Sequence, residues 1–155
     1  MVIDEIIKKL SNEGILKENE IYGYEEEKIV NLEKKYKVSF PKVYRDFLKK
    51  LIKFFEVDGG FNNGLNLSYN DLFHFRSDFE EKIIDKHLST FKLPFNAFVF
   101  GIRDFDIAYF FICENKKSDT EIFEFSSIST TPQSFSKSFS EFLKKEIDIM
   151  ISDFY

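Results

Sequence analysis

Three apolar runs in the second half of the chain constrain its fold more than any other feature. They cover residues 97–102, 107–113 and 121–125, and all three contain Phe and Ile. Runs of this length and composition predict β-strands. The polar stretches between them, residues 103–106 and 115–120, have the length of hairpin turns, and no crossover helix intervenes. The runs therefore predict an antiparallel β-meander.

Helical patterns fill the first third of the chain, and Pro41 divides them. Apolar residues at positions 3, 6, 7 and 10 precede Gly14 and predict a short first helix. Three glutamates at 25–27 suit the first turn of a second helix. Because proline lacks an N–H and suits a first turn, Pro41 is expected to end that helix and start another. The buried face of the helix after Pro41 is predicted to be Tyr44, Phe47, Leu48, Leu51 and Phe55.

Between these helices and the meander the pattern is weaker. Asn63-Gly64 signals a hairpin turn. A short strand is expected within residues 65–75, and a short helix or turn within residues 79–88.

A further helical pattern closes the chain. Ser138 and Glu141 match a capping box, so the regular helix is expected to begin there. Its apolar positions are Phe135, Phe139, Phe142, Leu143, Ile147 and Met150. Helices on both sides of a meander predict an α+β fold. We expect one domain over residues 1–155, with an antiparallel sheet of about four to six strands packed against N-terminal helices and a C-terminal helix. The predicted core is Tyr44, Phe47, Leu48, Phe98, Phe100, Phe110, Ile112, Phe123, Phe139, Phe142 and Leu143.

Charge and cysteine content limit the partners and the compartment. The chain has 27 acidic and 22 basic residues, a formal net charge of −5, and its lysine pairs are dispersed, which argues against a nucleic-acid binder. Cys113 is the only cysteine, so no intrachain disulfide is possible and a reducing compartment is expected. The N-terminus lacks a signal-peptide profile, and no apolar run reaches the roughly 20 residues of a membrane span. These features predict a cytoplasmic protein without a membrane partner.

No motif in the chain carries recognisable catalytic or metal chemistry. The Gly59–Asn66 stretch has two glycines at phosphate-loop spacing, but Leu65 and Asn66 replace the required Lys and Ser or Thr. His74 and His87 form no zinc motif. A catalytic Cys113–His pair remains open, although a buried structural role for Cys113 is favoured. We therefore predict no catalytic, cofactor-binding or metal-binding residues.

Asp104 and Asp106 flank Phe105 in a predicted hairpin turn. Two carboxylates at this spacing suit a cation site or an acid/base pair. Aspartate is also common in turns because its side chain bonds nearby backbone amides, and this structural interpretation is favoured.

The order of several short motifs resembles the SUKH superfamily, the Smi/Knr-type domain. In this chain they are "NLEKKYKVSFPKVYRDFL", a Gly-Gly break, "LPFNAFVFG" and "SFSEFL". The matching positions are Glu33, Pro41, Tyr44, Phe47, Leu48, Ser138, Phe139, Phe142 and Leu143, within a resemblance over residues 21–147. The chain departs from the pattern in having Phe40 before the proline, a longer stretch up to Gly59-Gly60, and a single glycine in the 101–106 region.

The resemblance implies a non-catalytic binding protein. Bacterial members of the superfamily are mostly immunity proteins that neutralise toxins, often nucleases, and a few eukaryotic relatives are signalling scaffolds. The leading hypothesis is therefore an immunity protein, or antitoxin, that blocks a cognate protein toxin by stoichiometric binding. The alternative is a scaffold or regulatory protein with a non-toxin partner. A small hydrolase using Cys113 or the Asp104/Asp106 pair is a remote third hypothesis.

A partner surface is predicted from aromatic residues with acidic neighbours in loop-like stretches. Aromatic anchors ringed by polar groups dominate many interfaces, and an acidic rim suits a basic toxin. The predicted partner-binding residues are Asp58, Phe61, Tyr69, Asp71, Asp104, Phe105 and Asp106.

Overall fold

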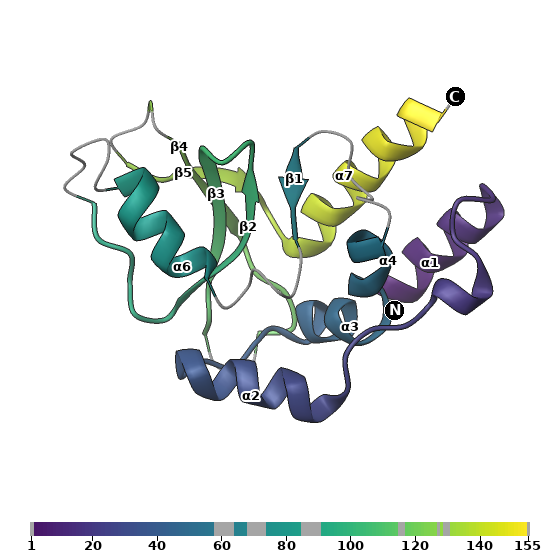
Figure 1. Ribbon diagram of the computed structural model, residues 1–155, viewed down its shortest axis with the longest axis horizontal. Coiled ribbons are helices and arrows are strands. Elements are labelled where there is room, and N and C mark those ends of the chain that lie inside the picture. Colours follow the sequence, from purple (N-terminus) through teal and green to yellow (C-terminus); the bar gives the residue numbers. More distant parts are fainter. Residues whose placement is uncertain are drawn as a thin grey trace.

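The computed structural model describes residues 2–57, 64–67, 74–84, 91–114, 117–126, 128 and 131–154. Helices gather on both sides of a central sheet, as Figure 1 shows: α6 lies to one side, and α1, α3, α4 and α7 lie to the other. A further helix, α2, crosses one end of the sheet. The predicted α+β fold is confirmed.

The N-terminal helices follow the predicted patterns closely. Helix α1 spans Val2–Asn12, the short 3-10 helix η1 spans Glu18–Glu20, and α2 spans Glu26–Tyr36. Helix α2 ends at Lys37, whose left-handed backbone (φ 54°) lets its N–H and that of Val38 return to carbonyls of the last turn. Pro41 then precedes α3, which spans Lys42–Lys50.

A carboxylate from α2 holds the corner before α3 in place. Glu33 Oε2 accepts the backbone N–H of Phe40 at 2.7 Å, and Glu33 Oε1 accepts Arg45 Nη2 at 2.9 Å. Arg45 also contacts Glu26 at 2.6 Å. Glu33 is one of the residues that carry the resemblance, and its observed role is to join the two helices on either side of Pro41.

The helix after Pro41 is interrupted, which the apolar spacing did not indicate. Helix α3 ends at Lys50, and a second short helix, α4, spans Ile52–Val57. The break coincides with a crossing segment: the Leu48 carbonyl, which would accept the Ile52 N–H in a continued helix, accepts the Tyr24 N–H at 2.8 Å. Gly23 permits this approach, since a Cβ there would lie 2.1 Å from the Leu48 oxygen.

The described residues form a five-stranded antiparallel sheet in the order β1-β2-β3-β4-β5. The strands are β1 (Leu65–Asn66), β2 (Ala97–Arg103), β3 (Ile107–Ile112), β4 (Ile122–Ser126) and β5 (Gln133–Ser136). The predicted meander is therefore confirmed, and β1 is the short strand expected within residues 65–75. Strand β5 was missed, and Phe135, which was predicted to lie on the last helix, belongs to it.

Both faces of the sheet are covered, which explains why β2 and β3 are continuously apolar rather than alternating. On one face Phe100 and Phe111 stack at 5.5 Å between ring centroids and meet Tyr44 of α3. On the other face Phe125 contacts Phe79, at 5.4 Å. Phe79 begins the π-helical segment η2 (Phe79–Ile84), which follows the short helix α6 (Phe75–Asp78).

The last helix, α7, spans Phe139–Phe154, and its start is held by two side chains. Ser138 Oγ accepts the Glu141 N–H at 3.0 Å, as the capping box predicted. Asp119, from the β3–β4 connection, accepts the Phe139 N–H at 2.9 Å and also bonds the Ser140 hydroxyl. Asp119 therefore ties the helix to a loop 20 residues earlier in the chain.

The predicted core is largely confirmed. Nine of its eleven members are buried, and Ile112 and Phe123 are only partly buried against the core. Both lie near strand ends: Ile112 is the last residue of β3, and Phe123 is the second residue of β4.

Candidate protein-binding site

The β2–β3 turn displays an aromatic side chain to solvent. Phe105 is 95% exposed at the tip of the turn, between Asp104 and Asp106. The Asp106 N–H donates to the Arg103 carbonyl at 3.1 Å, and the two residues between them have φ values of 53° and 61°. Positive φ at both central positions suits the right-handed twist of a hairpin. For a bulky residue such as Phe it is strained, at about 1–3 kcal/mol.

Gly64 packs directly against this turn. The Asp104 N–H donates to the Gly64 carbonyl at 3.1 Å, next to the pairing of Leu65 with Arg103. Gly64 has φ 80°, and a Cβ there would lie 1.9 Å from Asp104 Oδ1. Any side chain at position 64 would therefore displace the Asp104 carboxylate. The contact also places the end of the glycine-rich stretch beside the turn.

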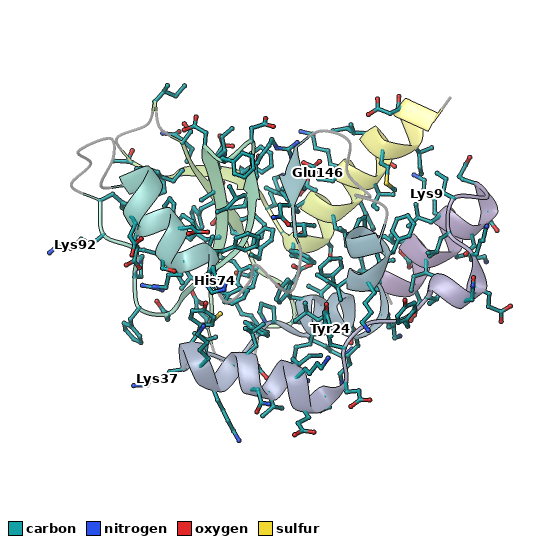
Figure 2. All side chains as sticks on the ribbon, in the orientation of Figure 1. Lys9, Tyr24, Lys37, His74, Lys92 and Glu146 are labelled. Carbon is teal, nitrogen blue, oxygen red and sulfur yellow. The ribbon has the colours of Figure 1, made fainter. Side chains whose placement is uncertain are left out.

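A buried ion pair anchors the base of the turn to the last helix. Arg103 pairs with Glu146 on α7, which is labelled in Figure 2 and is 3% exposed. Arg103 Nε also donates to Tyr109 Oη at 2.9 Å. Burial raises the pKa of the Tyr109 hydroxyl, and the Arg103 hydrogen bond opposes that shift, so Tyr109 stays protonated as a neutral acceptor at neutral pH. The turn is thus held on a rigid base.

Only some of the predicted partner-binding residues can be placed. Asp104, Phe105 and Asp106 lie together at the turn, with Asp104 and Phe105 exposed. The other four predicted residues lie outside the described residues: Asp58, Phe61, Tyr69 and Asp71.

Sequence reasoning missed a second exposed apolar residue at the same end of the sheet. Ile128, in the β4–β5 connection, is 94% exposed. It follows Ser126, which pairs with Ile107, the first residue after the β2–β3 turn. The sequence feature that could have indicated this exposed residue is an isolated isoleucine within the polar stretch "SSISTT". With strands about 4.8 Å apart, the two connections lie roughly 10 Å from each other.

The described residues show little support for metal or thiol chemistry. Among them, no group of three or more His, Cys, Asp or Glu side chains is placed to hold a metal ion. Cys113 is half-buried, and burial, with a smaller effect of the Glu33 charge, raises the pKa of its thiol to about 12. Since the thiolate is the nucleophilic form, Cys113 is poorly suited to catalysis at neutral pH. Within the same described part, no helix is long and apolar enough to cross a bilayer.

Comparisons with known proteins identify a family. The model of the SMI1 / KNR4 family (SUKH-1) matches residues 23–145, about four-fifths of the chain. The match includes the Pro41 corner, the sheet and the start of α7, and it excludes α1 and Glu146. The comparison with curated proteins returned no match. The extent of the family match shows that the chain belongs to the SMI1 / KNR4 family (SUKH-1).

Proposed function

We propose that this chain is an immunity protein that binds a cognate protein toxin and blocks it stoichiometrically through the β2–β3 turn. One observation carries the assignment of the surface: Phe105 is 95% exposed on a backbone with positive φ. A relaxed turn would place Gly, Asn or Asp at this position. The chain instead accepts both backbone strain and an exposed apolar ring, and such strain concentrates at functional sites.

The chemistry around Phe105 favours a basic partner. Asp104 and Asp106 flank the ring, and the chain carries a net charge of −5. An aromatic anchor within an acidic rim buries apolar area at the centre of an interface, and it attracts a positively charged partner over longer distances. Ile128 supplies a second apolar contact at the same end of the sheet. A basic nuclease fits these requirements.

Family membership supports a role in binding rather than catalysis. The resemblance described above implies that bacterial members of the superfamily are mostly immunity proteins without catalytic residues. Such a protein acts in the cytoplasm, where it meets its toxin. It requires a stable scaffold and a shaped surface but no active site.

The test is co-expression with the toxin encoded by the neighbouring reading frame, together with a direct binding measurement. Phe105→Ala should weaken toxin binding at least tenfold and abolish protection of the host cell. Charge reversal to Lys at four predicted acidic positions should also weaken binding and make the loss depend on salt. Those positions are Asp58, Asp71, Asp104 and Asp106.

Matched controls separate a surface effect from a change in net charge. The control variant carries Lys at four acidic positions elsewhere, Glu18, Glu25, Glu27 and Glu81, and should keep full affinity. A correctly folded Phe105→Ala variant that binds and protects like the parent would reject this interface. A neighbouring toxin that the parent chain neither binds nor neutralises would reject the immunity function and favour the scaffold hypothesis.

A further inference from the structure

A groove lies at the end of the sheet opposite the β2–β3 turn. It runs between the C-terminal half of α2 and the chain segments where β2 begins and β3 ends; Figure 1 shows α2 across this end. The main hollow has a volume of about 670 Å³, within the range of ligand-binding clefts. A second hollow of about 410 Å³ continues it towards α3, and Ser39 and Glu114 line both. We call the two hollows together the α2 groove.

The walls of the α2 groove combine apolar contact area with free hydrogen-bonding groups. Val30, Val38 and Cys113 line the main hollow, and Phe95 at its edge is 83% exposed. The side chains of Asn96 and Ser39 make no hydrogen bond to any described residue, although the Asn96 carbonyl accepts the Cys113 N–H at 2.8 Å. A free side-chain amide has both a donor and an acceptor, which matches the two groups of a peptide unit.

The charge of the α2 groove is opposite to that of the whole chain. Its lining contains six cations, Lys34, Lys37, Lys42, Arg45, Lys49 and Lys117, against three carboxylates. Each carboxylate is already paired: Glu33 with Arg45, Asp46 with Lys42, and Glu114 with Lys117.

Two lysines of the groove remain available to a ligand. Lys34 and Lys37 have no ion-pair partner among the described residues, and Lys37 extends away from the end of α2 in Figure 2. Positively charged side chains are stabilised near the negative, C-terminal end of a helix dipole, and this effect alone can explain why Lys34 and Lys37 stand at the end of α2. The dipole does not explain the exposed ring of Phe95 or the free amide of Asn96 beside them.

We propose that the α2 groove binds an extended acidic peptide segment of a protein partner that contains an aromatic or aliphatic side chain. Carboxylates of the segment pair with Lys34 and Lys37, its backbone bonds Asn96, and its apolar side chain packs on Phe95. A nucleic acid fits less well, because four of the six lining cations are already held in ion pairs with carboxylates. The two remaining lysines are too few to follow a continuous row of phosphates. This second binding site is independent of the toxin-binding role of the β2–β3 turn.

The probe is a fluorescently labelled eight-residue peptide of alternating glutamate and phenylalanine, titrated with the full chain and followed by anisotropy. Binding should be saturable and should weaken at least tenfold in Lys34→Glu/Lys37→Glu and in Phe95→Ala. The control variant Lys8→Glu/Lys137→Glu makes the same change in charge at exposed positions outside the groove and should bind like the parent. A peptide with lysine in place of glutamate should not bind.

An independent readout uses the single cysteine. Because Cys113 lines the groove and is the only thiol in the chain, its alkylation by iodoacetamide at pH 9, followed by mass spectrometry, reports occupancy of the groove. Bound peptide should slow alkylation in the parent and in the control variant, but not in the groove variants.

Three outcomes would overturn the proposal. They are an absence of binding by the glutamate–phenylalanine peptide, equal binding by the groove variants and the parent, and equal binding of an oligothymidylate at the same site. None of the substituted positions belongs to the β2–β3 turn. A negative result in the peptide experiment therefore does not bear on the proposed binding of a toxin by that turn.

Discussion

Tyr44 offers the sharpest test of the packing, because its hydroxyl is buried without a hydrogen bond to any described residue. The side chain is 1% exposed and lies among six aromatic rings. We predict that Tyr44→Phe stabilises the protein. Removing the oxygen removes an unsatisfied polar group and keeps the ring in the same contacts.

The magnitude follows from two opposing contributions. A buried hydroxyl without a partner costs about 1–3 kcal/mol of folding free energy. Removing it leaves a void of roughly 10–15 Å³, about the smallest cavity that can hold one water molecule. At about 24 cal/mol per Å³ of cavity, that void costs about 0.3 kcal/mol. The free energy of unfolding should therefore rise by about 0.7–2.7 kcal/mol. Each kcal/mol raises Tm by about 2–4 °C for a chain of this size.

The assay is urea unfolding followed by circular dichroism, since the chain has no tryptophan. Tyr109→Phe is the matched control, because the Tyr109 hydroxyl accepts Arg103 Nε at 2.9 Å. Losing a hydrogen bond to a charged group should destabilise that variant by about 1.5–3 kcal/mol. The same substitution at two buried tyrosines is thus expected to change stability in opposite directions.

A pH profile gives a second readout. Burial raises the pKa of Tyr44 well above its ordinary value of 10.0. The folded state then holds the proton after the unfolded state has lost it, so this contribution to stability is full below pH 10 and falls as the pH rises above it. Tyr44→Phe should reduce the alkaline loss of stability. A destabilised Tyr44→Phe variant would refute the unsatisfied hydroxyl, and an unchanged alkaline limb would refute the raised pKa of Tyr44.

Three further substitutions test other parts of the structure. Phe139→Ala should lower the free energy of unfolding by about 3–5 kcal/mol, since Phe139 is fully buried; parental stability in urea would mean that α7 is misplaced. Hydrogen bonds from Arg45 and then Lys49 lower the pKa of Glu26 from 4.5 to about 2, so stability is lost as the pH falls through that window. In Glu26→Gln, the free energy of unfolding should fall less steeply with decreasing pH. An unchanged slope would contradict the ion pairs of Glu26 with Arg45 and Lys49. Phe105→Gly should raise Tm by relieving about 1 kcal/mol of backbone strain, and a lowered Tm would argue against the positive φ.

The sequence by itself determined the features that depend on neighbours along the chain. The apolar runs of the meander, the corner at Pro41 and the Ser138 cap all appear as local patterns, because strand period, proline geometry and capping act over a few residues. The candidate site was half predictable for the same reason. Asp104 and Asp106 were readable as turn residues, and Phe105 between them was predicted as an aromatic residue available to a partner, which agrees with its observed exposure. Its left-handed backbone was not predictable, because a bulky residue rarely adopts positive φ.

Tertiary structure decided whatever depends on contacts between distant segments. Helix α3 stops where Tyr24 bonds the Leu48 carbonyl, and α7 is capped by Asp119 from the β3–β4 connection. The polar strand β5 is short and lacks an apolar run, so pairing with β4 defines it. The α2 groove joins residues from α2, the start of β2 and the end of β3. Such features arise from packing and hydrogen bonds across large sequence separations, which no local period encodes.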